Sequence, residues 1–199
     1  TLSGAGAVLP ATLIATAPDM TGLLCAVTDG GTKVYLSGNG GASWTSLLTP
    51  PLTGTIQAIT MSRKYIDGDT TYVEIAIGTA IWGNATTDGQ LYIIRIGNPF
   101  ATWANQNLTV DGTLIGGEIS AIAYSPGYAN DRTITVVAST NGDTAPAFAS
   151  KTWLCIGTRD TTTNTTTWNT PVAGYPVEVG TVGSPSSGDA PGVTRLLSF

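Results

Sequence analysis

The sequence contains no histidine, and only 11% of its residues are charged. Without histidine there can be no His-based catalytic triad, no histidine metal ligand and no histidine switch near neutral pH. The 8 lysines and arginines are outnumbered by 13 acidic residues, which gives a net charge of -5. So few basic side chains cannot form a basic surface that would bind phosphate backbones or anionic lipids. Nucleic acid is therefore excluded as a partner.

Long hydrophobic runs are also lacking, although apolar residues make up 42% of the 199 positions. The apolar stretch over residues 5–17 contains Pro10 and is too short to span a bilayer. We therefore predict a folded protein without a membrane-spanning segment. The first residue is Thr1 rather than Met, and the simplest expectation is an exported protein whose leader has been removed, located outside the cell or on its surface.

Cysteines are few, and both lie inside apolar runs. Cys25 and Cys155 have no CxxC spacing, which excludes the common metal and redox motifs. Two alternatives remain open: buried free thiols on core strands, or a disulfide in an exported protein. The acidic segments 67–69 and 141–143 lack the spacing of a calcium loop, so we interpret them as ordinary turns and predict neither metal nor cofactor.

Three sequons could accept N-linked glycans in an exported protein, and they begin at Asn84, Asn107 and Asn164. Threonine is abundant and fills residues 161–167 except at Asn164. A surface rich in threonine is polar without being charged, and threonine favours β-strands. The composition is therefore typical of a surface glycoprotein.

The chain contains an internal repeat, and a repeat determines the fold within which single residues must be interpreted. Residues 56–65 align with residues 119–128 at an offset of 63, and both segments precede an acidic turn and an alternating β-rich run. A shorter copy opens the chain, where residues 14–18 match 122–126 and residues 23–28 supply the second strand. These matches indicate three units.

Each unit continues with a third strand that carries an aromatic residue and then with a turn that delivers a tryptophan. The aromatic residues are Tyr35, Tyr92 and Trp153, and the tryptophans are Trp44, Trp103 and Trp168. Four short strands per unit and no helical period predict an all-β chain made of the four-stranded antiparallel blades of a β-propeller. We place the repeats at about 11–50, 55–110 and 118–172.

The tail departs from this pattern. Residues 173–192 are rich in Gly, Pro and Ser and are predicted to form a loop, whereas residues 193–199 look like the first strand of a further repeat. Propellers close with about four to eight blades, so three blades and one strand predict an incomplete ring. Continuation of the polypeptide, another subunit or strand exchange between neighbours would complete it, and continuation is the favoured expectation.

One turn carries a resemblance to a known family. The segment from Ser37 to Trp44 reads Ser-Gly-Asn-Gly-Gly-Ala-Ser-Trp and resembles the Asp-box, Ser-x-Asp-x-Gly-x-x-Trp, of sialidase-type (BNR) repeat propellers. Ser37, Gly41 and Trp44 match the pattern, and Asn39 stands where the family has Asp. A short carboxamide can accept hydrogen bonds from its own turn, and glycines allow positive φ. Residues 125–134 likewise resemble a strand connection of sortilin-like (Vps10) repeats, so that the resemblance covers nearly all of residues 11–170.

The resemblance implies a scaffold rather than an activity. In the family these boxes lie on outer turns, away from the central site, and they are structural. A sialidase would also need an arginine cluster, a tyrosine paired with a glutamate, and an acid. We match no arginine or glutamate here to that catalytic pattern, and we interpret the arginines as solvated turn residues. They are Arg63, Arg95, Arg132, Arg159 and Arg195, and the glutamates are Glu74, Glu118 and Glu178.

The leading hypothesis is a non-catalytic, exported cell-surface protein that serves as a surface-layer, filament or accessory subunit. Its partner would be another protein or a second copy, or glycans, because incomplete blades leave strand edges that invite pairing. One alternative is a carbohydrate-binding or sialidase-like glycoside hydrolase propeller. Another is an assembly factor docked on a membrane complex.

Overall fold

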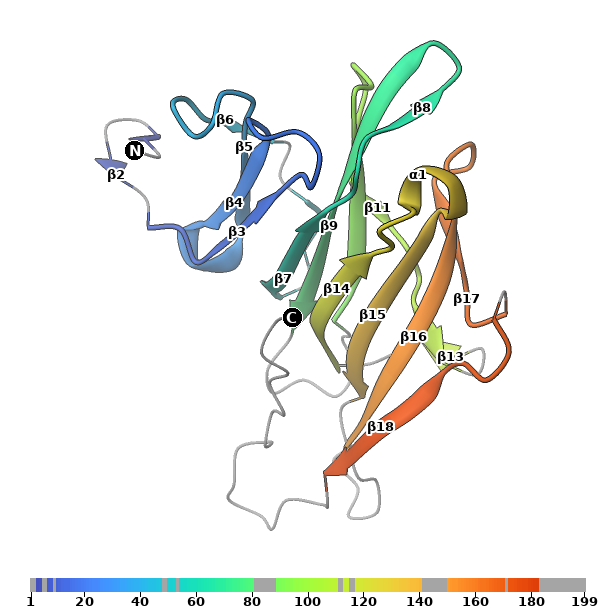
Figure 1. Ribbon diagram of the computed structural model, residues 1–199. Coiled ribbons are helices and arrows are strands. Elements are labelled where there is room, and N and C mark those ends of the chain that lie inside the picture. Colours follow the sequence, from blue (N-terminus) through green and yellow to red (C-terminus); the bar gives the residue numbers. More distant parts are fainter. Residues whose placement is uncertain are drawn as a thin grey trace.

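A computed structural model describes residues 3–4, 7–8, 10–47, 50–52, 54–80, 89–110, 113–114, 117–140, 150–170 and 172–182 (Figure 1). The prediction of an all-β chain is confirmed. Three antiparallel sheets contain most of the described residues, and they form no closed barrel. The short pairs β1 (Ser3–Gly4) with β2 (Ala7–Val8) and β12 (Thr109–Val110) with β13 (Thr113–Leu114) stand apart from them. No helix in these described segments is long and apolar enough to cross a membrane.

The first sheet has the order β3-β4-β5-β6, so each strand pairs with the next one along the chain. Its strands are β3 (Leu13–Thr16), β4 (Leu24–Thr28), β5 (Lys33–Ser37) and β6 (Thr45–Ser46). A single 3-10 turn, η1 (Asp29–Gly31), joins β4 to β5. The chain reverses there because Asp29, Gly30 and Gly31 all adopt positive φ, a conformation that glycine accepts without steric cost.

The second sheet follows the same plan, with the order β7-β9-β10-β11. These strands are β7 (Thr55–Met61), β9 (Thr70–Ala80), β10 (Leu91–Ile96) and β11 (Ala104–Asn105). One extra strand, β8 (Tyr65–Asp67), pairs with the start of β9 as a short hairpin.

The third sheet has the order β14-β15-β16-β17, and β18 pairs with β16 beside this path. Its strands are β14 (Gly117–Tyr124), β15 (Thr133–Thr140), β16 (Ser150–Asp160), β17 (Thr165–Trp168) and β18 (Val177–Val182). A one-turn helix, α1 (Tyr128–Asp131), connects β14 to β15.

Two details differ from the sequence predictions. Residues 177–182 form strand β18 rather than loop, because their alternating Val-Glu-Val-Gly-Thr-Val pattern pairs with the long strand β16. Trp168 is the last residue of β17 rather than part of a turn before the fourth strand, whereas Trp44 and Trp103 directly precede β6 and β11. The further strand predicted for residues 193–199 lies outside the described residues.

Strand pairing gives the three sheets equivalent rows of residues. In each sheet, paired residues of the first, second and third strands form rows that run across the sheet. We call the face that carries the following rows the front face. The front-face rows are Ile14, Ala26 and Tyr35 in the first sheet, Ile59, Ile77 and Tyr92 in the second, and Ile122, Val136 and Cys155 in the third. Even the irregularity is shared, because β7 and β14 both shift register at the same point, after Ile56 and Ile119. The prediction that Trp153 corresponds to Tyr35 and Tyr92 is wrong by two residues, because Cys155 holds that place in the row of the third sheet.

Because side chains alternate along a strand, the neighbouring residues form an opposite, back face. One row of it is Ala15, Cys25 and Leu36 in the first sheet, Thr60, Ala76 and Ile93 in the second, and Ala123, Thr135 and Ile156 in the third. The other row is Leu13, Val27 and Val34, then Ala58, Gly78 and Leu91, then Ala121, Val137 and Leu154.

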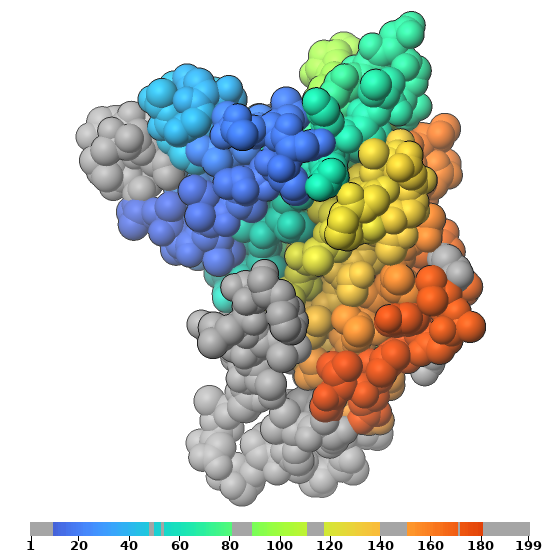
Figure 2. All heavy atoms as spheres, viewed as in Figure 1, coloured from blue at the N-terminus to red at the C-terminus, as the bar shows by residue number. Residues whose placement is uncertain are grey.

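The sheets stack front to back, with the second sheet between the other two (Figures 1 and 2). The first hydrophobic cluster joins back-face residues of the first sheet, such as Cys25 and Val27, to front-face residues of the second, such as Ile77 and Tyr92. The second cluster joins the back face of the second sheet to the front face of the third. Both contacts therefore use equivalent faces, and we call them the first and second contacts.

Candidate functional site

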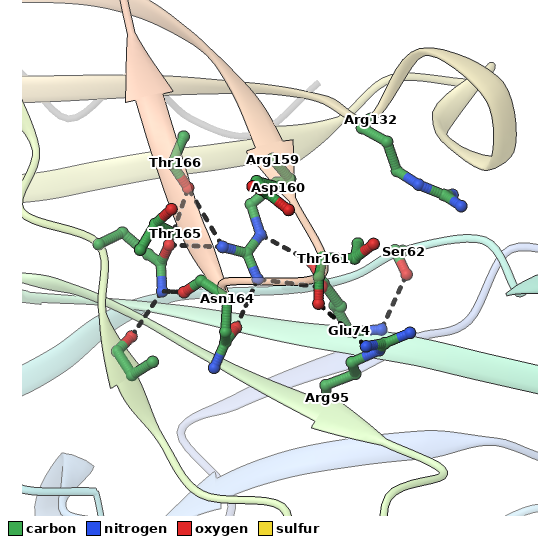
Figure 3. A network of polar contacts seen from close by, with 12 residues as sticks. Ser62, Glu74, Arg95, Arg132, Arg159, Asp160, Thr161, Asn164, Thr165 and Thr166 are labelled. Atoms are coloured by element: carbon green, nitrogen blue, oxygen red, sulfur yellow. Dashed lines mark hydrogen bonds and ion pairs between the residues drawn. The ribbon is translucent and has the colours of Figure 1, made fainter. Parts of the chain in front are cut away.

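The most concentrated polar chemistry among the described residues lies inside the second contact. Glu74 interrupts an apolar run of β9, and its side chain is fully buried. Arg159 lies on β16 of the third sheet, and its side chain is likewise 0% exposed in the ion pair with Glu74. These residues are 85 positions apart in the sequence, and the stacking of the two sheets brings them together (Figure 3).

The carboxylate of Glu74 is occupied on both oxygens. Arg159 donates from Nε to Oε2 at 3.1 Å and from Nη2 to Oε1 at 3.0 Å, which is a two-point contact. The hydroxyl of Tyr65 donates to Oε1 at 3.1 Å, and that of Tyr128 donates to Oε2 at 2.5 Å. Four donors thus converge on one carboxylate.

The guanidinium of Arg159 is equally occupied. Its Nη1 donates to Oε1 of Gln106 at 2.6 Å and to Oγ1 of Thr166 at 3.4 Å, and its Nη2 also donates to Oδ1 of Asn164 at 2.7 Å. Together with the two bonds to Glu74, these contacts use all five N–H donors of an arginine. Gln106 is itself fixed, because it accepts from Thr166 and donates to the carbonyl of Ala104.

The electrostatics keep Arg159, Tyr65 and Tyr128 each in one protonation state. Burial alone would lower the pKa of Arg159, but the charge and hydrogen bonds of Glu74 outweigh it and raise that pKa. Burial, and then the charge of Glu74, raise the pKa values of Tyr65 and Tyr128 well above the ordinary range. The arginine therefore stays charged, and the tyrosines remain neutral donors rather than nucleophiles.

Two further arginines flank the network: one stacks on Tyr65 of the network and the other on the neighbouring Tyr72. The guanidinium carbon of Arg132 lies 3.9 Å from the ring centroid of Tyr65, and that of Arg95 lies 3.6 Å from the ring centroid of Tyr72. Arg95 also forms an ion pair with Asp67 at 2.5 Å. The stacking of Arg132 on Tyr65 and that of Arg95 on Tyr72 are cation–π interactions.

The interpretation of the arginines as solvated turn residues is therefore wrong for Arg159, and for Arg95, whose side chain is only 16% exposed. The physical reason is that Glu74 and Asp67 compensate their charges. The sequence signal was the single charge of Glu74 inside Val73-Glu74-Ile75, because an unpaired charge would not be stable there. Nothing in the sequence identifies its partner.

The Asp-box-like turn, which links β5 to β6, is a second polar cluster. Oδ1 of Asn39 accepts from the backbone N–H of Ser43 at 2.9 Å and from the hydroxyl of Ser37 at 3.0 Å. The hydroxyl of Ser37 accepts from the backbone of Gly41, which has a φ of 86°, and the indole of Trp44 donates to the carbonyl of Gly41 at 3.0 Å. All of these hydrogen bonds join residues within the turn itself.

Both cysteines are free thiols, and no disulfide joins them. Cys25 lies in the first hydrophobic cluster and Cys155 in the second, so the second sheet separates them. Burial raises the pKa of Cys25 to about 12 and that of Cys155 to about 11. At neutral pH these thiols are protonated and unreactive.

The sequon asparagines have unlike environments. Asn107 is exposed and adopts a φ of 45°. Asn164 is half-buried and holds Arg159, so it belongs to the network in the second contact. Asn84 and the acidic turn at residues 141–143 lie outside the described residues. Within the part of the chain that the structure describes, no three His, Cys, Asp or Glu side chains are placed to hold a metal ion.

The sequence matches no protein-family model, and no curated protein matches it. The buried network therefore has to be interpreted from its own geometry. That geometry joins two sheets and leaves the Glu74 carboxylate without contact to solvent.

Proposed function

We propose that the protein is a non-catalytic, exported structural or interaction protein of the cell surface, with its three sheets as propeller-type blades. The observation that carries the proposal is the complete occupation of Glu74 and Arg159 by each other and by their neighbours. A catalytic acid or a carboxylate-binding arginine must reach its substrate, and neither of these side chains is exposed.

Composition and topology support the remaining parts of the proposal. The low charge, the abundant threonine and the absence of histidine suit an exported surface protein. Three consecutive antiparallel sheets that stack front to back support the proposal, because propellers are built from repeated four-stranded sheets. In this proposal the Asp-box-like turn at Asn39 stiffens the outer edge of the first sheet.

The alternative of a glycoside hydrolase is tested most directly. Glu74 lies beside Tyr65, Tyr128 and Arg159, which are the residue types of a sialidase site. The experiment measures turnover of a panel of chromogenic glycosides and sialosides by the wild-type protein and by Glu74→Gln. We expect no turnover above the buffer blank from either protein.

Turnover that Glu74→Gln abolishes while the circular dichroism spectrum is unchanged would contradict the proposal. The matched control is Asp160→Asn, which alters an exposed carboxylate next to Arg159 in the sequence. The third hypothesis, a factor docked on a membrane complex, predicts that the native protein co-purifies with a defined membrane complex after mild detergent extraction.

A further inference from the structure

We propose that the third sheet binds the first sheet of a second copy of this chain, so that copies associate head to tail. This inference rests on the proposed function and names the partner of the interaction surface. At both contacts within the chain, the front face of one sheet covers the back face of the preceding sheet.

The back face of the third sheet has the composition of a contact face but remains partly exposed. Leu91 and Ile93 on the back face of the second sheet are 0% exposed because the third sheet covers them. Their equivalents Leu154 and Ile156 are only half-buried, Val137 is likewise half-buried, and Ala123 is exposed. The six residues of the two rows defined above are all apolar or threonine; they are Ala121, Ala123, Thr135, Val137, Leu154 and Ile156.

The front face of the first sheet is its counterpart. The equivalents of Ile14 in the second and third sheets, Ile59 and Ile122, both pack against a hydrophobic cluster. Ile14 itself is 62% exposed, although Ala26 beside it is buried. Tyr35 is half-buried, whereas its equivalent Tyr92 is 3% exposed.

A second copy is the occupant that the repeat itself specifies. By register, the back face of the third sheet and the front face of the first sheet are equivalent to the faces that meet in the first and second contacts. Each copy of the chain therefore carries both faces that one more such contact needs. The rows named above contain no charged residue. Two charges lie at the ends of these faces: Lys33, which forms an ion pair with Asp29 at 2.9 Å, and Asp160, which is exposed. The centre of the contact therefore buries no unpaired charge. Contact between two different faces of identical copies is heterologous, and it forms a ring if the rotation closes or a filament if it does not.

The test uses two variants of the full chain, each of which blocks one face with a lysine. Ile14→Lys blocks the front face of the first sheet, and Ile156→Lys blocks the back face of the third. Light scattering and analytical ultracentrifugation then measure the mass of each protein alone and of their equimolar mixture. We expect the wild type to self-associate and each variant alone to be monomeric, with the dissociation constant raised at least about 100-fold by an unpaired buried charge.

The mixture provides the decisive result. One variant keeps an intact back face and the other an intact front face, so they should form a one-to-one dimer that grows no further, because two lysines meet at the remaining contact. Ile66→Lys, at an isoleucine that is 71% exposed on β8 and belongs to neither face, should associate like the wild type. If Ile156→Lys does not fold, Ala123→Lys blocks the same face at an exposed residue.

Three results would overturn the proposal: a monomeric wild type over the whole concentration range, variants that still self-associate, or a mixture that stays monomeric. A monomeric wild type without glycosidase turnover would leave the proposed non-catalytic function standing with a different partner. Turnover abolished by Glu74→Gln would instead contradict the proposed function, whatever the state of association.

Discussion

The two contacts between sheets use equivalent faces, yet they are built differently. The first contact is an apolar cluster that surrounds Ile75 and Ile77 of the second sheet. The second contact has an apolar cluster too, but it also encloses the ion pair of Glu74 and Arg159. The first contact joins its two sheets by apolar stacking and an exposed hydrogen bond from the N–H of Lys64 to Oδ1 of Asp19, without a buried ion pair among the described residues. The network of the second contact adds a directional constraint that apolar packing lacks.

The two cysteines provide a separate reporter for each contact. Cys25 is buried in the first contact and Cys155 in the second. The rate at which iodoacetamide alkylates each thiol, followed by peptide mass spectrometry, thus measures how often each contact opens.

The largest effect is expected from Arg159→Ala, which leaves the carboxylate of Glu74 buried without its counter-charge. We expect a loss of about 3–5 kcal/mol in the free energy of unfolding, measured by urea denaturation. Alkylation of Cys155 should accelerate more than that of Cys25. Equal acceleration of both thiols would show that the network does not belong to the second contact alone.

The matched control is Lys33→Ala, which removes an exposed ion pair with Asp29 at 2.9 Å. No measurable change is expected there because solvent screens such pairs. In addition, the loss for Glu74→Leu combined with Arg159→Leu should be smaller than the sum of the two single losses, since the two residues are coupled.

A smaller effect is expected from Gly78→Ala, which tests the packing of the second contact without touching its charges. A Cβ at residue 78 would lie 2.4 Å from Cγ2 of Ile119, so the third sheet must shift. We expect a loss of about 1–3 kcal/mol in unfolding free energy, the usual range for overpacking. Gly180→Ala, where a Cβ meets no atom within 4 Å, is the control, and an equal loss in both variants would contradict this explanation.

Alkaline pH should weaken both contacts through their thiols. Burial raises the pKa of Cys25 to about 12 and that of Cys155 to about 11, above the ordinary value of about 8.5. Between the unfolded and folded values only the unfolded chain loses the proton, so stability is complete below about pH 8.5 and falls as pH rises. Each thiol should remove at most about 1.4 kcal/mol per pH unit in that window.

The measurement compares the free energies of unfolding at pH 8.5 and pH 9.5 for the wild type, Cys25→Ala and Cys155→Ala. Each substitution should make the pH dependence shallower. An unchanged slope in both variants would show that the tyrosines of the network, whose pKa values are also raised, dominate the alkaline response.

The smallest effect is expected from Asn39→Ala, in a turn that takes part in neither contact. Losing the bonds of Asn39 to Ser37 and Ser43 should cost about 1 kcal/mol and leave both alkylation rates unchanged. Asn39→Asp keeps the acceptor for the Ser43 N–H and should retain most of the stability. A change in either thiol rate would link this turn to the stacking of the sheets.

Some of these features could be predicted from the sequence. Alternating segments such as residues 71–79 and 133–140 identified second strands β9 and β15, because strand periodicity is local. Strand β18 was missed because glycine and proline dominate its surroundings, while its pairing partner β16 lies more than twenty residues earlier. The cysteines were left open between two states, since spacing alone does not say which faces of two sheets they occupy.

The sequence by itself determined the all-β character, the repeated unit and the hydrogen-bonded turn at Asn39, because each depends on residues that are close together in the chain. Only the tertiary structure decided that Glu74 meets Arg159 and that Tyr65 and Tyr128 complete the site. It also decided which faces remain partly exposed. Each of these outcomes depends on how sheets that are tens of residues apart in the sequence stack. A charge buried between two sheets is stable only when an opposite charge pairs with it.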